Sequence, residues 1–246
     1  LPFEFDATGF LSKDVNELSL SVRDVSDTSY HSRGKQKLKR GGIWYTPQSG
    51  IWQTVWAECI PKDCVRSLHI TPDFDHACVN VRADVVGESK AYALFDGQQY
   101  PLPASIPVPG FEPWSPENPK LYDFSVVCGE DRVESYFAMR KFSVEADQNG
   151  VKRLFLNGKP YFHNGLLDQG YWSDGMYTAP SDEALIFDIQ TAKDMGFNML
   201  RKHIKIEPMR WYYHCDRLGM LVWQDMINGG GTYNLLTISA PLITGI

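Results

Sequence analysis

Charged side chains follow three short apolar runs in the second half of the chain, at the points where parallel strands would end. Asp168 follows the first run, Arg201 and His203 end the second, and Asp225 follows the third. The carboxyl ends of parallel strands meet at one edge of a sheet, and chemistry gathers at that edge. These residues therefore point either to a polar ligand site or, more simply, to inter-strand ion pairs at a surface.

The segment that must position these side chains alternates strands and helices. Ser181 is a suitable N-cap, the apolar residues after it repeat at helical spacing, and Gly196 is a natural stop. Strand, helix, strand, helix and strand are predicted at residues 161–167, 181–196, 198–202, 209–218 and 220–224. This order with short connections predicts the start of a parallel α/β sheet, either open or closed as a barrel.

The first 142 residues have a different pattern, in which short alternating runs are separated by Pro, Gly, Asp and Asn. Such runs are typical of antiparallel β-sandwiches. A boundary near Pro61 divides this half, and the proline-rich residues 101–119 predict an extended connection. Strands are predicted at residues 17–23, 54–59, 65–71, 78–85 and 122–127.

An aromatic stretch at residues 41–56 holds Trp44, Tyr45, Trp52 and Trp56 around two turn signals. This density of rings favours the anchoring of a loop or a flat surface on which a sugar can stack. The residues from Gly50 onward alternate as in a half-buried strand. The basic run 33–40 just before the stretch favours a solvated loop over a clamp for an anionic ligand.

The composition argues against several classes of partner. A net charge of −6 and a pI near 5.5 disfavour nucleic acid, and no apolar run is long enough to span a membrane. Five cysteines and the lack of a signal-peptide pattern predict free thiols and a cytoplasmic location. The Cys and His spacing between residues 59 and 78 lacks zinc knuckles, so neither a metal nor a cofactor is expected.

Four separated groups of residues, in the same order, resemble glycoside hydrolase family 2, the β-galactosidase, β-glucuronidase and β-mannosidase group. These are GGIWYTPQSGIWQTVW, then WSPENPKLYDF with SYFAMRKFSV, then NGKP, and finally GFNMLRKH with CDRLGMLVWQD. The resemblance implies the C-terminal part of a jelly-roll sugar-binding domain at residues 1–62. An immunoglobulin-like β-sandwich at 63–142 and the N-terminal part of a (β/α)8 TIM barrel at 143–246 are implied to follow.

The same resemblance implies a retaining β-glycosidase of the β-galactosidase kind, which needs two carboxylates roughly 5 to 5.5 Å apart. In the family the acid/base is the Glu of an Asn-Glu pair after the fourth barrel strand. Here Asn16-Glu17 falls in a predicted jelly-roll strand and Glu117-Asn118 in the proline-rich connection, so neither pair matches. A barrel takes about 250 residues, so both catalytic carboxylates are expected to be missing and the chain to be inactive alone.

By resemblance, Arg201 is the position that orients the catalytic carboxylates, and Asp168, His203 and Asp225 are partners for sugar hydroxyls or for a charge network. Trp44 stands where galactosidases and glucuronidases of the family send an acidic side chain toward the sugar. An indole can stack on a sugar but cannot accept a hydroxyl proton. The implied substrate is a β-linked glycoside or oligosaccharide, and the basic run 33–40 keeps a uronide open.

Two alternatives to an enzyme piece stay open: a non-catalytic carbohydrate-binding module, and a scaffold β-sandwich that holds subunits together. A barrel that ends after three strands would also leave strand edges and apolar helix backs uncovered. Association as a homo-oligomer, or with a complementing chain, is therefore expected. The apolar, β-branched residues 235–246 would add to that tendency.

Overall fold

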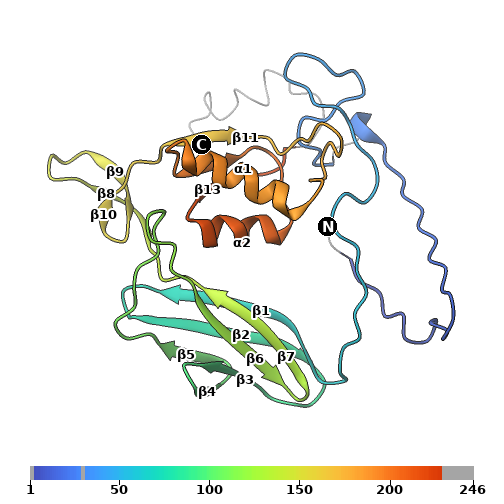
Figure 1. Ribbon diagram of the computed structural model, residues 1–246, viewed down its shortest axis with the longest axis horizontal. Helices are drawn as coiled ribbons and strands as arrows, with labels where there is room; N and C mark the ends of the chain where they lie inside the picture. The colour runs from blue at the N-terminus through green and yellow to red at the C-terminus, as the bar shows by residue number, and fades with distance from the viewer. Residues whose placement is uncertain (1–2, 29–30, 229–246) are drawn as a thin grey trace, which may run out of the picture.

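The computed structural model describes residues 3–28 and 31–228 (Figure 1). Within these ranges the chain forms four small sheets and two α-helices. A β-sandwich occupies one side of the molecule, a parallel sheet with both helices occupies the other, and the N-terminal segment runs along the outside of both. The predicted boundaries at residues 62 and 142 remain predictions, as does the jelly-roll assignment of residues 1–62.

Two antiparallel sheets form the all-β sandwich and confirm the predicted architecture of this part. One sheet has the order β1-β2-β5 and the other the order β4-β3-β6-β7. Alternating side chains such as Val79, Val81 and Val126 point between the sheets and are almost fully buried. The strands are β1 Cys64–Asp73, β2 Cys78–Val86, β3 Ala91–Phe95, β4 Gln98–Pro101, β5 Ala104–Pro107, β6 Tyr122–Cys128 and β7 Asp131–Phe137.

The prediction that residues 101–119 form only an extended connection is wrong for β5. This strand pairs with β2 in antiparallel register, with Ile106 opposite Val79. Ile106 is buried in the sandwich core, so the burial of one apolar side chain outweighs the proline content of the segment. As an edge strand, β5 also tolerates the missing N–H of Pro107.

A three-stranded antiparallel sheet connects the sandwich to the parallel sheet. It consists of β8 Phe142–Ala146, β9 Lys152–Leu156 and β10 Lys159–Pro160. Asn157 and Gly158 form the two-residue turn between the last two strands, with φ angles of 53° and 75°. Positive φ at both positions is what such a hairpin turn requires, and Asn-Gly is the pair that best adopts it.

The parallel sheet contains β11 Gly165–Asp168, β12 Met199–Lys202 and β13 Leu221–Gln224, with α1 Asp182–Asp194 and α2 Met209–Leu218 in the connections. The predicted alternation is confirmed, although β11 begins later than expected. Ser181 caps α1 by accepting a hydrogen bond from the Ala184 N–H at 3.2 Å, and Gly219 ends α2 in the left-handed conformation.

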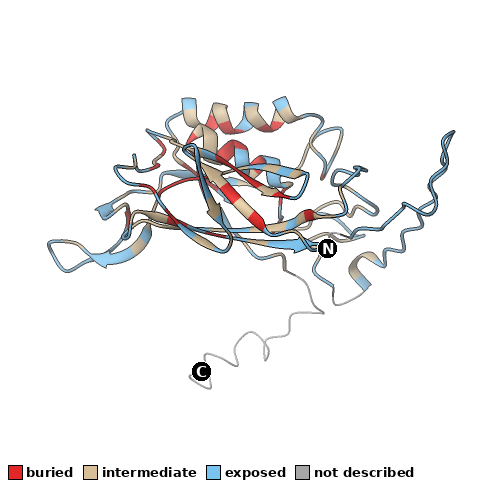
Figure 2. Ribbon diagram, turned by 90° about the horizontal axis from the view of Figure 1, so that it is seen from below, coloured by how far each residue is buried: buried red, intermediate tan, exposed pale blue. Residues whose placement is uncertain are grey.

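Both helices cover one face of the parallel sheet. Leu200 of β12 packs with Leu185 and Ile189 of α1 and with Trp211 of α2 in one core, and Figure 2 shows the buried stripes of the two helices. The opposite face carries Leu167, Arg201 and Trp223 in register, and all three are exposed. The sheet therefore has one covered and one uncovered face.

Two predicted strands are absent from the N-terminal segment. Residues 17–23 and 54–59 form no strand, and the half-buried strand from Gly50 is also wrong, since Trp56 is 72% exposed. A strand needs a neighbour to accept its backbone hydrogen bonds, and the described residues offer none to these runs. Apart from isolated bridges, the short 3₁₀ helix η1 Ser26–Thr28 is the one regular element in the described part of this segment.

Asp216 of α2 joins the sandwich to the helical layer. Its carboxylate accepts hydrogen bonds from Arg140 at 2.6 Å and from Tyr136 at 3.0 Å, and its backbone carbonyl accepts one from the Trp114 indole at 2.7 Å. The Arg140 guanidinium also lies over the Trp114 ring, 4.5 Å from its centre. These contacts fix α2 against the sandwich, and through it the strands that carry the candidate site.

Neither α-helix among the described residues is long and apolar enough to cross a membrane. The five cysteines are free thiols. The predicted aggregation-prone segment 235–246 lies outside the described residues.

Candidate functional site

Three of the predicted site residues meet at the carboxyl edge of β12 and β13. Arg201 donates two hydrogen bonds to Asp225, from Nε to Oδ1 at 3.0 Å and from Nη2 to Oδ2 at 3.1 Å. His203 Nδ1 lies 2.6 Å from the same Oδ2. A guanidinium and an imidazole thus share one carboxylate, which holds both in a fixed geometry.

The charges around Asp225 keep its carboxyl ionised. Burial acts to raise its pKa, but the hydrogen bonds from Arg201 and then from His203 outweigh burial, so the pKa lies below its ordinary value. The Asp225 side chain is 20% exposed and that of Arg201 is 49% exposed. Arg201 therefore still has N–H groups directed to solvent, whereas Asp225 is largely enclosed by its partners.

A fourth residue, Lys35, completes this cluster from the N-terminal segment. Its Nζ lies 3.0 Å from His203 Nε2. An ammonium has no acceptor, so Nε2 must accept this hydrogen bond and the ring proton must sit on Nδ1, where it is donated to Asp225. The two contacts together assign the neutral Nδ1–H tautomer to His203.

The loop that carries Lys35 is fixed to the strand ends through its backbone. The N–H groups of Arg33 and Gly34 donate to the carbonyl of Asn228 at 2.9 and 3.1 Å, and the Lys35 N–H donates to the Asn228 side chain at 3.1 Å. Gly34 has a φ of 58°, and a Cβ there would lie 2.7 Å from the Ile204 carbonyl oxygen. Only glycine permits this approach, so the prediction of a solvated loop is wrong for residues 33–37.

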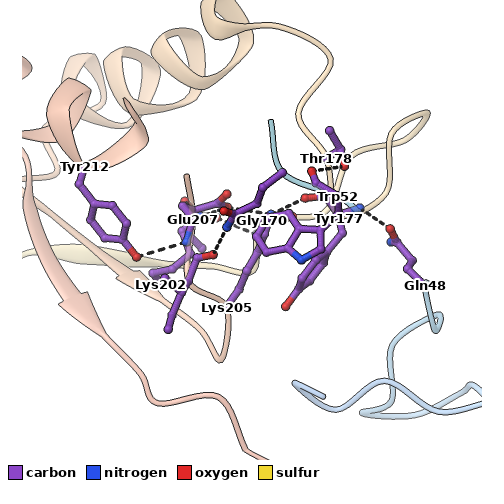
Figure 3. Close-up of polar contacts among 12 residues, drawn as sticks. Gln48, Trp52, Gly170, Tyr177, Thr178, Lys202, Lys205, Glu207 and Tyr212 are labelled. Carbon is purple, nitrogen blue, oxygen red and sulfur yellow. Dashed lines mark hydrogen bonds and ion pairs between the residues drawn. The ribbon is translucent and has the colours of Figure 1, made fainter. Parts of the chain in front are cut away.

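A second charge cluster is buried and is formed around Glu207 (Figure 3). Glu207 Oε1 is 2.9 Å from Lys202 Nζ and 2.8 Å from Lys205 Nζ, and all three side chains are at most 3% exposed. Lys202 also pairs with Asp168 at 2.8 Å. Burial lowers the pKa of Lys205, and the charge of Glu207 acts against that effect.

Backbone oxygens and aromatic rings complete the shell of Lys205. Its ammonium donates to the carbonyls of Gly170 at 2.6 Å and Tyr177 at 2.8 Å, and it lies over the rings of Tyr177 and Trp52. The Thr178 hydroxyl donates to the Trp52 carbonyl at 2.8 Å. This buried cluster therefore attaches the aromatic stretch 41–56 to the α/β layer, and Trp52 anchors a loop as the ring density indicated.

The structure separates the five predicted site residues into three groups. Arg201, His203 and Asp225 are together, as the spacing indicated. Asp168 is turned to Lys202 and to the Gly170 N–H, in the buried cluster. Trp44 lies under the Lys37 ammonium, 3.9 Å from the ring centre, and within the described part of the chain no contact joins it to Arg201, His203 or Asp225. Lys35 was missed, and the basic run 33–40 was its signal in the sequence.

Tyr171 gives a measurable signature of the contact between the N-terminal segment and this layer. Its ring packs edge-on against Tyr45, and burial, with a smaller effect of Tyr45, raises its pKa to about 12. The pKa of an unfolded tyrosine is ~10. The folded state therefore favours the neutral phenol more than the unfolded state does, and this contribution to stability is complete below pH ~10. It is lost as the pH rises to about 12.

The phenolate absorbance of Tyr171→Phe is measured against pH and subtracted from that of the parent protein. We expect this difference to titrate as one group with a pKa of about 12. Tyr92→Phe, on the sandwich, provides the control for a tyrosine away from this contact. A difference titration with its midpoint at pH ~10 would contradict the packing of the aromatic stretch against Tyr171.

Comparisons with known proteins show what the chain is similar to. No family model matches the chain. The β-galactosidase of Photobacterium profundum is 29% identical over 257 residues, which covers 92% of this chain and 24% of the relative. The β-galactosidase of Streptococcus thermophilus is 25% identical over 98% of this chain and 24% of its own length. This chain is similar to β-galactosidases and to family 2 glycoside hydrolases.

Solved structures of glycosidases share the fold of this chain. The β-glucuronidase of Faecalibacterium prausnitzii superimposes with a TM-score of 0.59 over 66% of this chain and 28% of its own, at 22% identity. A family 2 β-galacturonidase of Eisenbergiella tayi, bound to galacturonate, gives 0.59 over 69% and 33%, at 20% identity. The chain spans about a quarter of the length of the curated relatives that it matches.

Proposed function

We propose that this chain forms part of a family 2 glycoside hydrolase that cleaves β-linked glycosides with retention of configuration. The observation that carries the proposal is the Arg201–Asp225–His203 cluster at the carboxyl edge of a parallel sheet, in a chain that aligns over most of its length with β-galactosidases. In this proposal the chain supplies one wall of the active-site mouth, and the acid/base and nucleophile carboxylates come from elsewhere in the complete protein.

The uncovered face of the parallel sheet supports its assignment to the first strands of a (β/α)8 barrel. Parallel sheets are normally covered on both faces, but here Leu167 and Trp223 are 53% and 45% exposed on the face opposite the helices. In a barrel that face turns inward and is filled by side chains from further strands. The active site of a barrel lies at the carboxyl ends of its strands, which is where the cluster stands.

The proposed role of Arg201 is to orient the catalytic carboxylates. Asp225 uses only two of the guanidinium N–H groups, so others can donate to a carboxylate or to a sugar hydroxyl. His203 and Asp225 hold Arg201 in place. Asp168 acts through Lys202 in the buried cluster, and its proposed role is therefore to support the loop after β11 and not to bind the sugar directly. Trp44 is proposed as a stacking surface at the rim of the site.

The test is hydrolysis of a panel of 4-nitrophenyl β-glycosides by the complete protein that contains this chain. We expect turnover of at least one β-linked glycoside, with the β-anomer released first when the reaction is followed by proton NMR. The isolated chain should be inactive, because it supplies no catalytic carboxylate. Binding of oligosaccharides without turnover by the complete protein would instead favour a carbohydrate-binding module. Release of the α-anomer would exclude the retaining mechanism.

A further inference from the structure

We propose that Lys35 determines substrate specificity in this site and selects glycosides that carry a carboxylate, such as uronides. The inference rests on the proposed function, because it assumes that a sugar binds beside the Arg201–Asp225–His203 cluster. Lys35 has three N–H donors, and its described contact uses one of them, with His203 Nε2 at 3.0 Å.

The contact with Lys35 occupies the position through which His203 would otherwise meet a ligand. Nδ1 of the ring is committed to Asp225 and Nε2 accepts from Lys35, so both ring nitrogens are used. The group that the N-terminal segment presents at the mouth is therefore an ammonium. An ammonium donates hydrogen bonds and prefers an anionic acceptor to a neutral hydroxyl.

The local charges do not neutralise this ammonium. Arg201 and Asp225 form a pair of opposite charges, and the assigned tautomer of His203 is neutral. Within residues 3–28 and 31–228, Lys35 has no carboxylate at ion-pair distance. The four residues of the cluster therefore carry one net positive charge, on the partly buried Lys35 side chain, and a substrate carboxylate beside it would be attracted.

The backbone of Lys35 is held in place before any ligand arrives, and the contact with His203 Nε2 positions its ammonium. Lys35 has a left-handed φ of 61°, its N–H bonds to Asn228, and its carbonyl accepts from the Tyr45 N–H at 3.0 Å. A preformed donor loses little conformational freedom on binding. Lys37 from the same run differs, because its ammonium lies over the Trp44 ring and not at the strand ends.

The test is titration calorimetry of the complete protein with two matched pairs of sugars: galacturonate against galactose, and glucuronate against glucose. We expect one uronate to bind more tightly than its neutral partner. Lys35→Met should weaken the binding of that uronate about tenfold more than the binding of its neutral partner, the loss of one hydrogen bond to a charged group. Lys35→Arg should retain most of the preference. Lys37→Met is the matched control and should retain all of it.

A second measurement tests the contact itself and does not depend on sugar binding. Nitrogen-15 NMR of labelled histidine should show the Nδ1–H tautomer for His203, with a changed Nε2 resonance in Lys35→Met. Thermal unfolding of each variant establishes that it is folded.

The inference is overturned if His203 carries its proton on Nε2, or if Lys35→Met binds uronates and neutral sugars with the parent ratio. Hydrolysis of neutral glycosides without any preference for uronates would sink this inference and leave the proposed function standing. A uronate preference that depends on Lys35, in a protein that hydrolyses no glycoside, would support this inference and refute the proposed function.

Discussion

Asp225→Asn is expected to lower kcat/KM of the complete enzyme toward its best glycoside by about 100-fold, the order of loss that follows when a catalytic group moves by about 1 Å. The carboxylate accepts two hydrogen bonds from Arg201 and one from His203. An amide keeps the shape but supplies only one acceptor oxygen and no charge. Arg201 then loses its bidentate partner and no longer holds a single orientation.

The measurement is steady-state kinetics on the panel of nitrophenyl glycosides, together with thermal unfolding. Unfolding should change little, because Arg201 is half exposed and can be solvated when its partner is lost. Asp84→Asn is the matched control, since Asp84 pairs with His69 on the exposed surface of the sandwich, and it should retain full activity. Parent-like kinetics for Asp225→Asn would refute the assignment of this cluster to the active site.

Glu207→Gln is expected to destabilise the protein by about 3 to 5 kcal/mol, the usual cost of removing one partner from a buried ion pair. Glu207 is the shared acceptor of Lys202 and Lys205, and both lysine side chains are 1% exposed. Without the carboxylate, two ammonium groups face each other across an amide, and only Lys202 retains a second carboxylate, that of Asp168. The repulsion cannot be relieved by solvent at this depth.

Urea denaturation followed by far-ultraviolet circular dichroism measures this loss as a lower midpoint. Glu134→Gln is the control, because Glu134 pairs with Arg132 on the surface, where the side chains of Glu134 and Arg132 are 66% and 58% exposed. This substitution should lower the free energy of unfolding by no more than about 1 kcal/mol. Adding Lys205→Met to Glu207→Gln should recover part of the lost stability, because it removes the ammonium that is left without a carboxylate. A midpoint for Glu207→Gln equal to that of Glu134→Gln would show that the buried cluster is not a stabilising element.

Periodicity alone predicted the elements that depend on local patterns. The helix Met209–Leu218 and the cap at Ser181 have the positions that apolar spacing and capping residues indicated. Of the sandwich strands, β1, β2 and β6 are close to their predicted bounds, whereas β3, β4, β5 and β7 were not predicted. The failures are the runs 17–23 and 54–59, where alternating residues meet no neighbouring strand. Alternation indicates that a run could lie in a sheet, but only a paired neighbour makes it a strand.

The sequence by itself determined which residues follow the parallel strands and therefore that Arg201, His203 and Asp225 share one edge. It could not determine that Lys35, more than 160 positions earlier than His203, completes that edge. Nor could it show that Asp168 turns inward to Lys202 while Trp44 stays apart under Lys37. Strand order follows from local patterns along the chain, whereas these contacts depend on where the N-terminal segment packs. Only the tertiary structure decides that packing, because it rests on contacts between residues far apart in the sequence.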